Sequence, residues 1–132
     1  NKGIKESGHL SVNIVTEDFL SKADYCGIVS GGKTDKSVVF DSVTGDDGTP
    51  MARESPLSME CKVEDVYECN GFENFICSRT YADDSVLGTD GKLDYDRLKP
   101  VLFEFPTYRY LRTGSIIGHC TDAGRKYKEN QS

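Results

Sequence analysis

Residues 23–36 read ADYCGIVSGGKTDK. The first half continues a helical pattern, and the second half is a glycine-rich turn that ends in Thr34, Asp35 and Lys36. Glycines let backbone N–H groups approach a phosphate or an electron-rich ring edge. The hydroxyls and the lysine add hydrogen-bond donors and a positive charge. A solvated surface loop has the same composition, so the residues alone leave both interpretations open.

Further motifs flank this turn in a definite order. Upstream, residues 4–14 read IKESGHLSVNI. Downstream, residues 56–63 read PLSMECKV, residues 90–94 read DGKLD, and residues 108–111 read YRYL. The ordered set resembles the flavin-reductase-like, FMN-binding split-barrel family, which includes the flavoredoxins, over nearly the whole chain.

The resemblance implies a mainly β fold with short helices, arranged as a split β-barrel in a single domain over residues 1–132. The sequence begins well inside the family's pattern, so we expect this domain to be incomplete at its N-terminus. The resemblance also implies FMN as cofactor, a homodimer, and NAD(P)H or a redox protein as electron donor. The implied activity is NAD(P)H:flavin oxidoreductase or flavoredoxin-like electron transfer, with no catalytic side chain assigned.

The turn supplies four of the cofactor-binding residues that the resemblance implies. Lys36 matches the family's lysine and would place a cation beside the flavin ring. Ser30 and Gly31 match its Ser-Gly turn and would offer a hydroxyl and an N–H. Asp35 belongs to the same set, although its side chain also suits a cap for residues 37–40. The alternative for all four is an ordinary surface turn.

Two further residues complete the candidate site. Tyr108 lies where the family places an aromatic ring close to the flavin, with core packing as its alternative role. Glu73 takes the position at which many family members carry a histidine facing the flavin. A carboxylate there would oppose ring reduction unless Lys36 or an arginine pairs with it. We also expect the apolar residues 102–110 to form part of the homodimer interface.

The composition of the chain limits the classes of partner that we expect it to bind. The chain has 132 residues and a net charge of −6, which disfavours nonspecific nucleic-acid binding. We find no apolar run of membrane-spanning length. Five scattered cysteines without a C-x-x-C pair indicate reduced thiols and a cytoplasmic location. Two histidines far apart in sequence predict no metal site.

Local patterns predict the elements. Gly8 should end a helix over residues 2–7, and Asn70-Gly71 should join two long strands. A slip in periodicity near Asp65 predicts a bulge. Asp94 should cap a short helix. Alternation over residues 9–15 predicts a half-buried strand with Leu10, Val12 and Ile14 on one face. The remaining expectations are a helix after Thr16, an exposed loop over 41–55, strands over 101–105 and 107–111, and a solvated tail around 125–128.

Two other functions stay open at this stage. One is a split-barrel protein that binds a flavin or another ligand without turnover, which the glutamate at the histidine position favours. The other is a β-rich interaction module without a cofactor. A yellow colour would separate the flavin proteins from the module.

Overall fold

The computed structural model describes residues 1–82 and 86–131, and thirteen elements follow one another along them. More of the described residues lie in strands than in helices, and the helices are short, as the sequence predicts. The elements are α1 (Lys2–Ser7), β1 (His9–Asn13), η1 (Glu17–Phe19), α2 (Leu20–Ile28), η2 (Lys36–Val38), β2 (Ser42–Thr44), β3 (Pro50–Ala52), β4 (Ser58–Cys69), β5 (Phe72–Ala82), α3 (Tyr95–Leu98), β6 (Val101–Glu104), β7 (Arg109–Arg112) and α4 (Asp122–Glu129).

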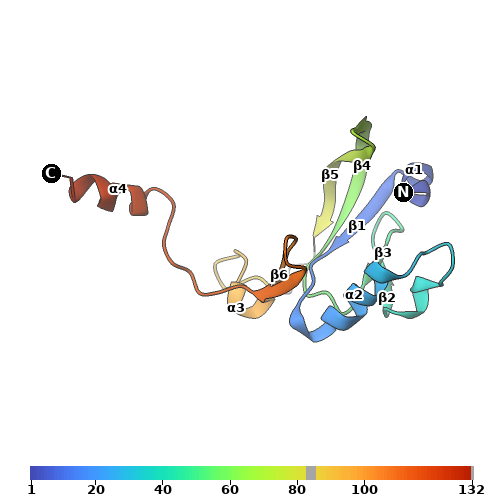
Figure 1. Cartoon of the computed structure of the whole chain (residues 1–132), viewed down its shortest axis with the longest axis horizontal. Coiled ribbons are helices and arrows are strands. Elements are labelled where there is room, and N and C mark those ends of the chain that lie inside the picture. The colour runs from blue at the N-terminus through green and yellow to red at the C-terminus, as the bar shows by residue number, and fades with distance from the viewer. Residues whose placement is uncertain (83–85, 132) are drawn as a thin grey trace.

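The main sheet has three antiparallel strands in the order β1-β4-β5 (Figure 1). Gly8 ends α1 with a φ of 71°, as predicted, and turns the chain directly into β1. Asn70 and Gly71 both have positive φ, at 52° and 80°, which is the geometry of a tight hairpin turn. The register of β4 against β5 shifts between Val63 and Asp65, so the predicted bulge is confirmed.

The prediction of an exposed loop over residues 41–55 is wrong. Strands β2 and β3 pair there as an antiparallel hairpin, and the Met51 side chain is buried. The Glu60 carboxylate, on β4, holds the turn of this hairpin by accepting hydrogen bonds from the backbone N–H groups of Asp47 and Thr49, at 3.0 and 2.9 Å. A contact between residues so far apart in sequence leaves no local signal within the loop itself.

A second hairpin, β6–β7, follows α3. Asp94 caps α3 by accepting hydrogen bonds from the N–H groups of Asp96 and Arg97, as predicted. The hairpin is tied to the α2 region at two points. The Tyr110 hydroxyl donates to Asp24 at 2.6 Å, and the Arg112 guanidinium forms two bonds with the Glu17 carboxylate.

The hydrophobic core of the described residues is small. Its buried apolar side chains are Phe19, Met51, Cys61, Val86 and Leu98. Leu10 and Ile14 are half-buried and Val12 is 39% exposed, so this face of the strand is half-buried, as predicted. All five cysteines have free thiols. None of the described helices is both long enough and apolar enough to span a lipid bilayer.

The C-terminal residues form a helix whose residues are all exposed, in agreement with the expected solvated tail. Helix α4 contains the basic residues Arg125, Lys126 and Lys128. It lies well away from the sheets, at the end of an extended segment that leaves β7 (Figure 1). We call residues 113–131 the arm.

Candidate functional site

The Asp35 side chain acts within its own turn. Its Oδ1 accepts hydrogen bonds from the Ser37 backbone N–H at 2.9 Å and from the Ser37 hydroxyl at 2.6 Å. These two bonds lower the pKa of Asp35, with the side-chain bond as the larger cause. Asp35 is therefore the cap of η2, which was the alternative role that its sequence position suggested.

Ser30 closes the glycine-rich turn. Its carbonyl accepts hydrogen bonds from the N–H groups of Lys33 and Thr34, at 3.0 and 2.9 Å. Its hydroxyl accepts a third bond from the Gly32 N–H at 3.3 Å. A side chain on Gly31 would meet the Lys36 Cε at 3.8 Å, so the lysine stem runs alongside the turn. The turn thus holds Lys36 in place.

Among the described residues, Lys36 is the one charged group that lines a hollow beside this turn. Its ammonium donates a hydrogen bond to the Cys26 carbonyl at 2.6 Å, near the C-terminal end of α2. The carbonyls at that end of a helix carry partial negative charge and attract a cation. An ammonium has three N–H donors, so this bond leaves two for a ligand.

The hollow beside Lys36 has a volume of about 310 Å³, at the lower end of the range for ligand sites. Its walls are largely apolar and come from four separate stretches of the chain. Phe19 and Phe40 meet edge to face, with ring centroids 6.1 Å apart. The lining also includes Val15, Cys26 and Met51. An apolar hollow with one cation at its edge suits a flat, electron-accepting ring better than a highly charged ligand.

Asn13 organises this wall from the end of β1. Its Oδ1 accepts hydrogen bonds from the Ala52 N–H at 2.9 Å and from the Ser58 hydroxyl at 2.8 Å. It thereby fixes β3 against the end of the main sheet and brings Met51 to the hollow. The sequence signal was a polar residue at the end of an apolar strand, which is typical of such bracing.

Ser30 and Gly31 do not line this hollow; both are exposed on the turn. Glu73 lies elsewhere, at the end of the β4–β5 hairpin. It forms an ion pair with Lys5 and accepts a hydrogen bond from the Asn1 side chain at 2.6 Å. Its positive partner is therefore Lys5 of α1, and not Lys36 as considered from the sequence.

Tyr108 is also apart from the Lys36 hollow. It sits in the β6–β7 turn with a φ of 54° and is 71% exposed. Its ring lies 6.2 Å from that of Phe103 and 5.5 Å from that of Phe105. This is an exposed aromatic cluster, so the alternative of core packing does not describe Tyr108 within this chain.

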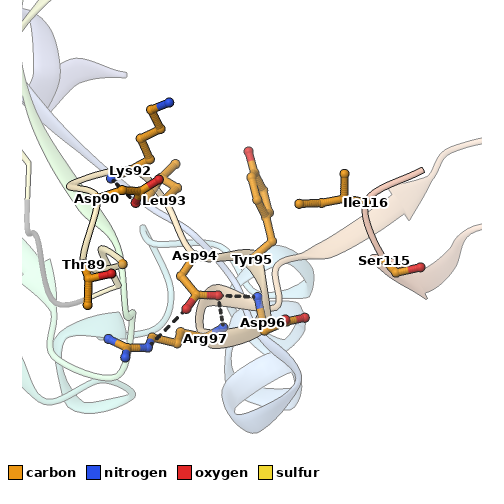
Figure 2. Close-up of a pocket in the computed structure, with 12 residues that line it drawn as sticks. Thr89, Asp90, Lys92, Leu93, Asp94, Tyr95, Asp96, Arg97, Ser115 and Ile116 are labelled. Atoms are coloured by element: carbon orange, nitrogen blue, oxygen red, sulfur yellow. Dashed lines mark hydrogen bonds and ion pairs between the residues drawn. The ribbon is translucent and has the colours of Figure 1, made fainter. Parts of the chain in front are cut away.

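Another hollow, of about 500 Å³, lies between the 88–97 segment and the start of the arm. It contains none of the residues predicted for the cofactor. Figure 2 shows Tyr95 and Ile116 facing each other across it. The Asp94 carboxylate in its wall already caps α3 and pairs with Arg97 at 3.3 Å. The Asp94 carboxylate thus serves the local fold.

The comparisons with known proteins agree with the mainly β architecture and with the flavin interpretation. The family model described as flavin reductase like domain matches residues 2–95. The chain belongs to this family. A comparison with the curated proteins returned no match.

Solved structures extend the family assignment along the chain. The flavoredoxin from Methanosarcina acetivorans is 32% identical, with a TM-score of 0.88 over 96% of this chain and 69% of that one. The flavoredoxin of Desulfovibrio vulgaris (Miyazaki F) is 29% identical, with a TM-score of 0.83 over 93% and 68%. A protein with a split barrel domain from Shewanella frigidimarina shares the fold at 17% identity, with a TM-score of 0.76 over 89% and 63%. The predicted split-barrel class is confirmed by these neighbours.

Proposed function

We propose that this protein binds FMN beside Lys36 and transfers electrons, as an NAD(P)H:flavin oxidoreductase or as a flavoredoxin-like carrier. The observation that carries the proposal is the Lys36 ammonium at the edge of a largely apolar hollow. Family membership and the two flavoredoxins near 30% identity support it.

The residues of the hollow fit a flavin ring. FMN would supply the redox chemistry, and the protein would supply binding, orientation and electrostatics. Phe19, Phe40 and Met51 would exclude water from the ring, which strengthens the field of the nearby ammonium. Lys36 would favour the reduced form of the ring because that form carries more negative charge. The adjacent hydroxyls of Ser30 and Thr34 are the donors that we assign to the phosphate side.

Absorbance tests this proposal directly. The purified protein, after incubation with excess FMN and gel filtration, should be yellow, with a band near ~450 nm. Addition of NADPH or NADH without oxygen should bleach the band. Mass spectrometry of the heat-released cofactor should give FMN and no FAD, since the compact turn offers room for one phosphate. A colourless protein would contradict flavin binding and favour an interaction module.

A second candidate function rests on Glu73. The family position that often holds a histidine holds a glutamate here, and its carboxylate is engaged by Lys5. The absence of the histidine from this position favours a protein that binds flavin without turning over a nicotinamide. A yellow protein whose band resists NAD(P)H, yet is bleached by dithionite, would support this candidate over the reductase.

The free thiols suit a reducing compartment, and we propose a cytoplasmic location on that ground.

A further inference from the structure

Helix α2 forms one wall of the hollow beside Lys36, yet none of the residues of α2 is buried. Ala23 and Cys26 line the hollow, and both are half-buried. Another wall comes from Phe40 and the β2–β3 hairpin. Burial of apolar side chains usually fixes a helix against its neighbours. Because α2 buries so little, polar contacts must contribute to its position.

Glu54, which follows β3, joins these two walls from outside the hollow. Its Oε1 accepts a hydrogen bond from the Lys22 ammonium of α2 at 2.7 Å. The same oxygen accepts a second bond from the backbone N–H of Asp41 at 3.3 Å. Lys22 directly precedes Ala23 in the chain, and Asp41 directly follows Phe40. One carboxylate oxygen therefore ties together two positions that each adjoin a lining residue on a different wall.

The bond between Lys22 and Glu54 is charge-assisted and partly shielded from water. The Glu54 side chain is 24% exposed and that of Lys22 is 48% exposed. Hydrogen bonds between ionised groups are stronger than neutral ones, and partial burial reduces their screening by salt. The bond from Lys22 is also the largest of the causes that lower the pKa of Glu54, so this carboxyl is ionised at neutral pH.

A neighbouring ion pair has a different reach. The Arg53 Nε lies 3.1 Å from the Asp41 Oδ2, and the two side chains are 62% and 73% exposed. Asp41 directly precedes β2, and Arg53 directly follows β3. This pair therefore links two parts of one wall, whereas the bond between Lys22 and Glu54 links one wall to the other.

We propose that Glu54 is a positioning residue for the flavin site, because its bonds with Lys22 and with the Asp41 N–H fix the separation of the two walls of the hollow. This role rests on the proposed function, since the flavin ring is the ligand whose fit the walls determine. The same contact restrains α2 and with it the Cys26 carbonyl, to which the Lys36 ammonium donates. The position of the cation beside the ring therefore also depends on Glu54.

The reactivity of the Cys26 thiol tests this role without any flavin. Cys26 lines the hollow and is half-buried, so parting of the walls should expose its thiol to iodoacetamide. Lys22→Gln and Glu54→Gln should each raise the alkylation rate of Cys26 about threefold, the size of effect typical of an ion pair at a partly exposed site. Mass spectrometry of the peptide that contains Cys26 separates this rate from those of the other thiols. Arg53→Gln removes the same charge as Lys22→Gln but breaks only the neighbouring pair, so it should leave the rate unchanged.

The affinity for FMN, measured by fluorescence titration, gives a second readout. Lys22→Gln removes a positive charge, and Glu54→Gln removes a negative one. Because FMN is an anion, general electrostatics would make the two changes shift its affinity in opposite directions. A positioning role predicts that both changes raise the dissociation constant about threefold. The double variant should bind FMN no more weakly than the weaker single variant, because both changes break one contact.

The two readouts distinguish a failure of this role from a failure of the proposed function. If no protein binds FMN, the proposed function fails, while faster alkylation of Cys26 in both variants still supports the role of Glu54 in holding the walls. Circular dichroism verifies that every variant keeps the native secondary structure. An unchanged alkylation rate in Lys22→Gln and Glu54→Gln, an equal rise in Arg53→Gln, or opposite shifts in FMN affinity would overturn the proposal.

Discussion

The Lys36 ammonium lies 2.6 Å from the Cys26 carbonyl, so the lysine that the sequence assigns to a flavin also neutralises the C-terminal end of α2. The helix end fixes where the charge sits before any ligand arrives. A ligand that binds a lysine already held in position pays a smaller entropic penalty than one that binds a flexible surface lysine. The reason is that the held lysine lost its side-chain entropy when the protein folded. The same contact gives Lys36 a structural role that mutation will reveal alongside its effect on the ligand.

Lys36→Ala should weaken FMN binding by roughly 1–3 kcal/mol, the range for removing a charge-assisted hydrogen bond in a partly buried site. It should also lower the midpoint potential of the bound flavin, because the reduced ring loses its nearest cation. Fluorescence titration at two salt concentrations gives the affinity, and a redox titration with a reference dye gives the potential.

Lys33→Ala is the matched control for that experiment. Lys33 belongs to the same turn and is exposed, so its loss should cost under ~0.5 kcal/mol. If the two variants lose equal affinity, and both losses shrink at high salt, the effect is diffuse electrostatics and not a defined contact of Lys36.

Glu60 makes the stability of the β2–β3 hairpin depend on pH. Hydrogen bonds from the backbone, that of Asp47 first, lower the pKa of Glu60 below its ordinary 4.5 and outweigh the opposing effect of burial. A carboxyl with a lowered pKa stabilises the fold above about pH 4.5, and this stabilisation is lost as pH falls through the folded-state value. Urea denaturation should therefore show that the free energy of unfolding of the native protein declines below pH 4.5. The Glu60→Gln variant should largely lack this decline. Parallel pH profiles of the two proteins would exclude this role.

Local chemistry explains which parts of the fold the sequence predicts. Gly8, Asn70-Gly71, Asp35 and Asp94 each act within a few residues of their own position, and each is found in the predicted role. The family pattern added the split-barrel class, which strand periodicity alone does not determine. Asp35 shows the limit of that pattern. It matches the family motif, yet an aspartate at this position can cap a helix as readily as it can bind a ligand.

The features that the sequence did not predict depend on distant contacts. The β2–β3 hairpin is held by Glu60, and Glu73 forms an ion pair with Lys5, which lies 68 residues earlier. Phe19, Phe40 and Met51 reach one hollow from different elements, so no single motif identifies them. Lys36 was predicted because a family motif contained it, whereas its apolar neighbours carry no motif.

Tyr110 should ionise at a higher pH than an ordinary tyrosine. Its hydroxyl donates to Asp24, and this bond, followed by burial and the nearby negative charge, raises the pKa of Tyr110 above its ordinary 10. A raised pKa means that the contact stabilises the fold below about pH 10 and is lost as pH rises through the folded-state value. In a titration followed at 295 nm, Tyr110→Phe should remove absorbance from the part of the curve above pH 10. A loss of absorbance at or below pH 10 instead would show that Asp24 does not hold the phenol.

Gly45→Ala should destabilise the protein, because a methyl group there would lie 2.5 Å from the Glu60 Oε2. The Glu60 side chain is fully buried and bonded to the hairpin turn, so it cannot move aside without losing those bonds. The expected loss is roughly 1–3 kcal/mol, as for other overpacked sites. Gly27→Ala makes the same chemical change inside α2, where nothing lies within 4 Å of the new methyl. Alanine is the better helix former by about 0.8–1 kcal/mol, so this variant should be more stable than the native protein. Urea denaturation at pH 7 measures both, and a Gly45→Ala protein as stable as the native one would show that the carboxylate is not confined.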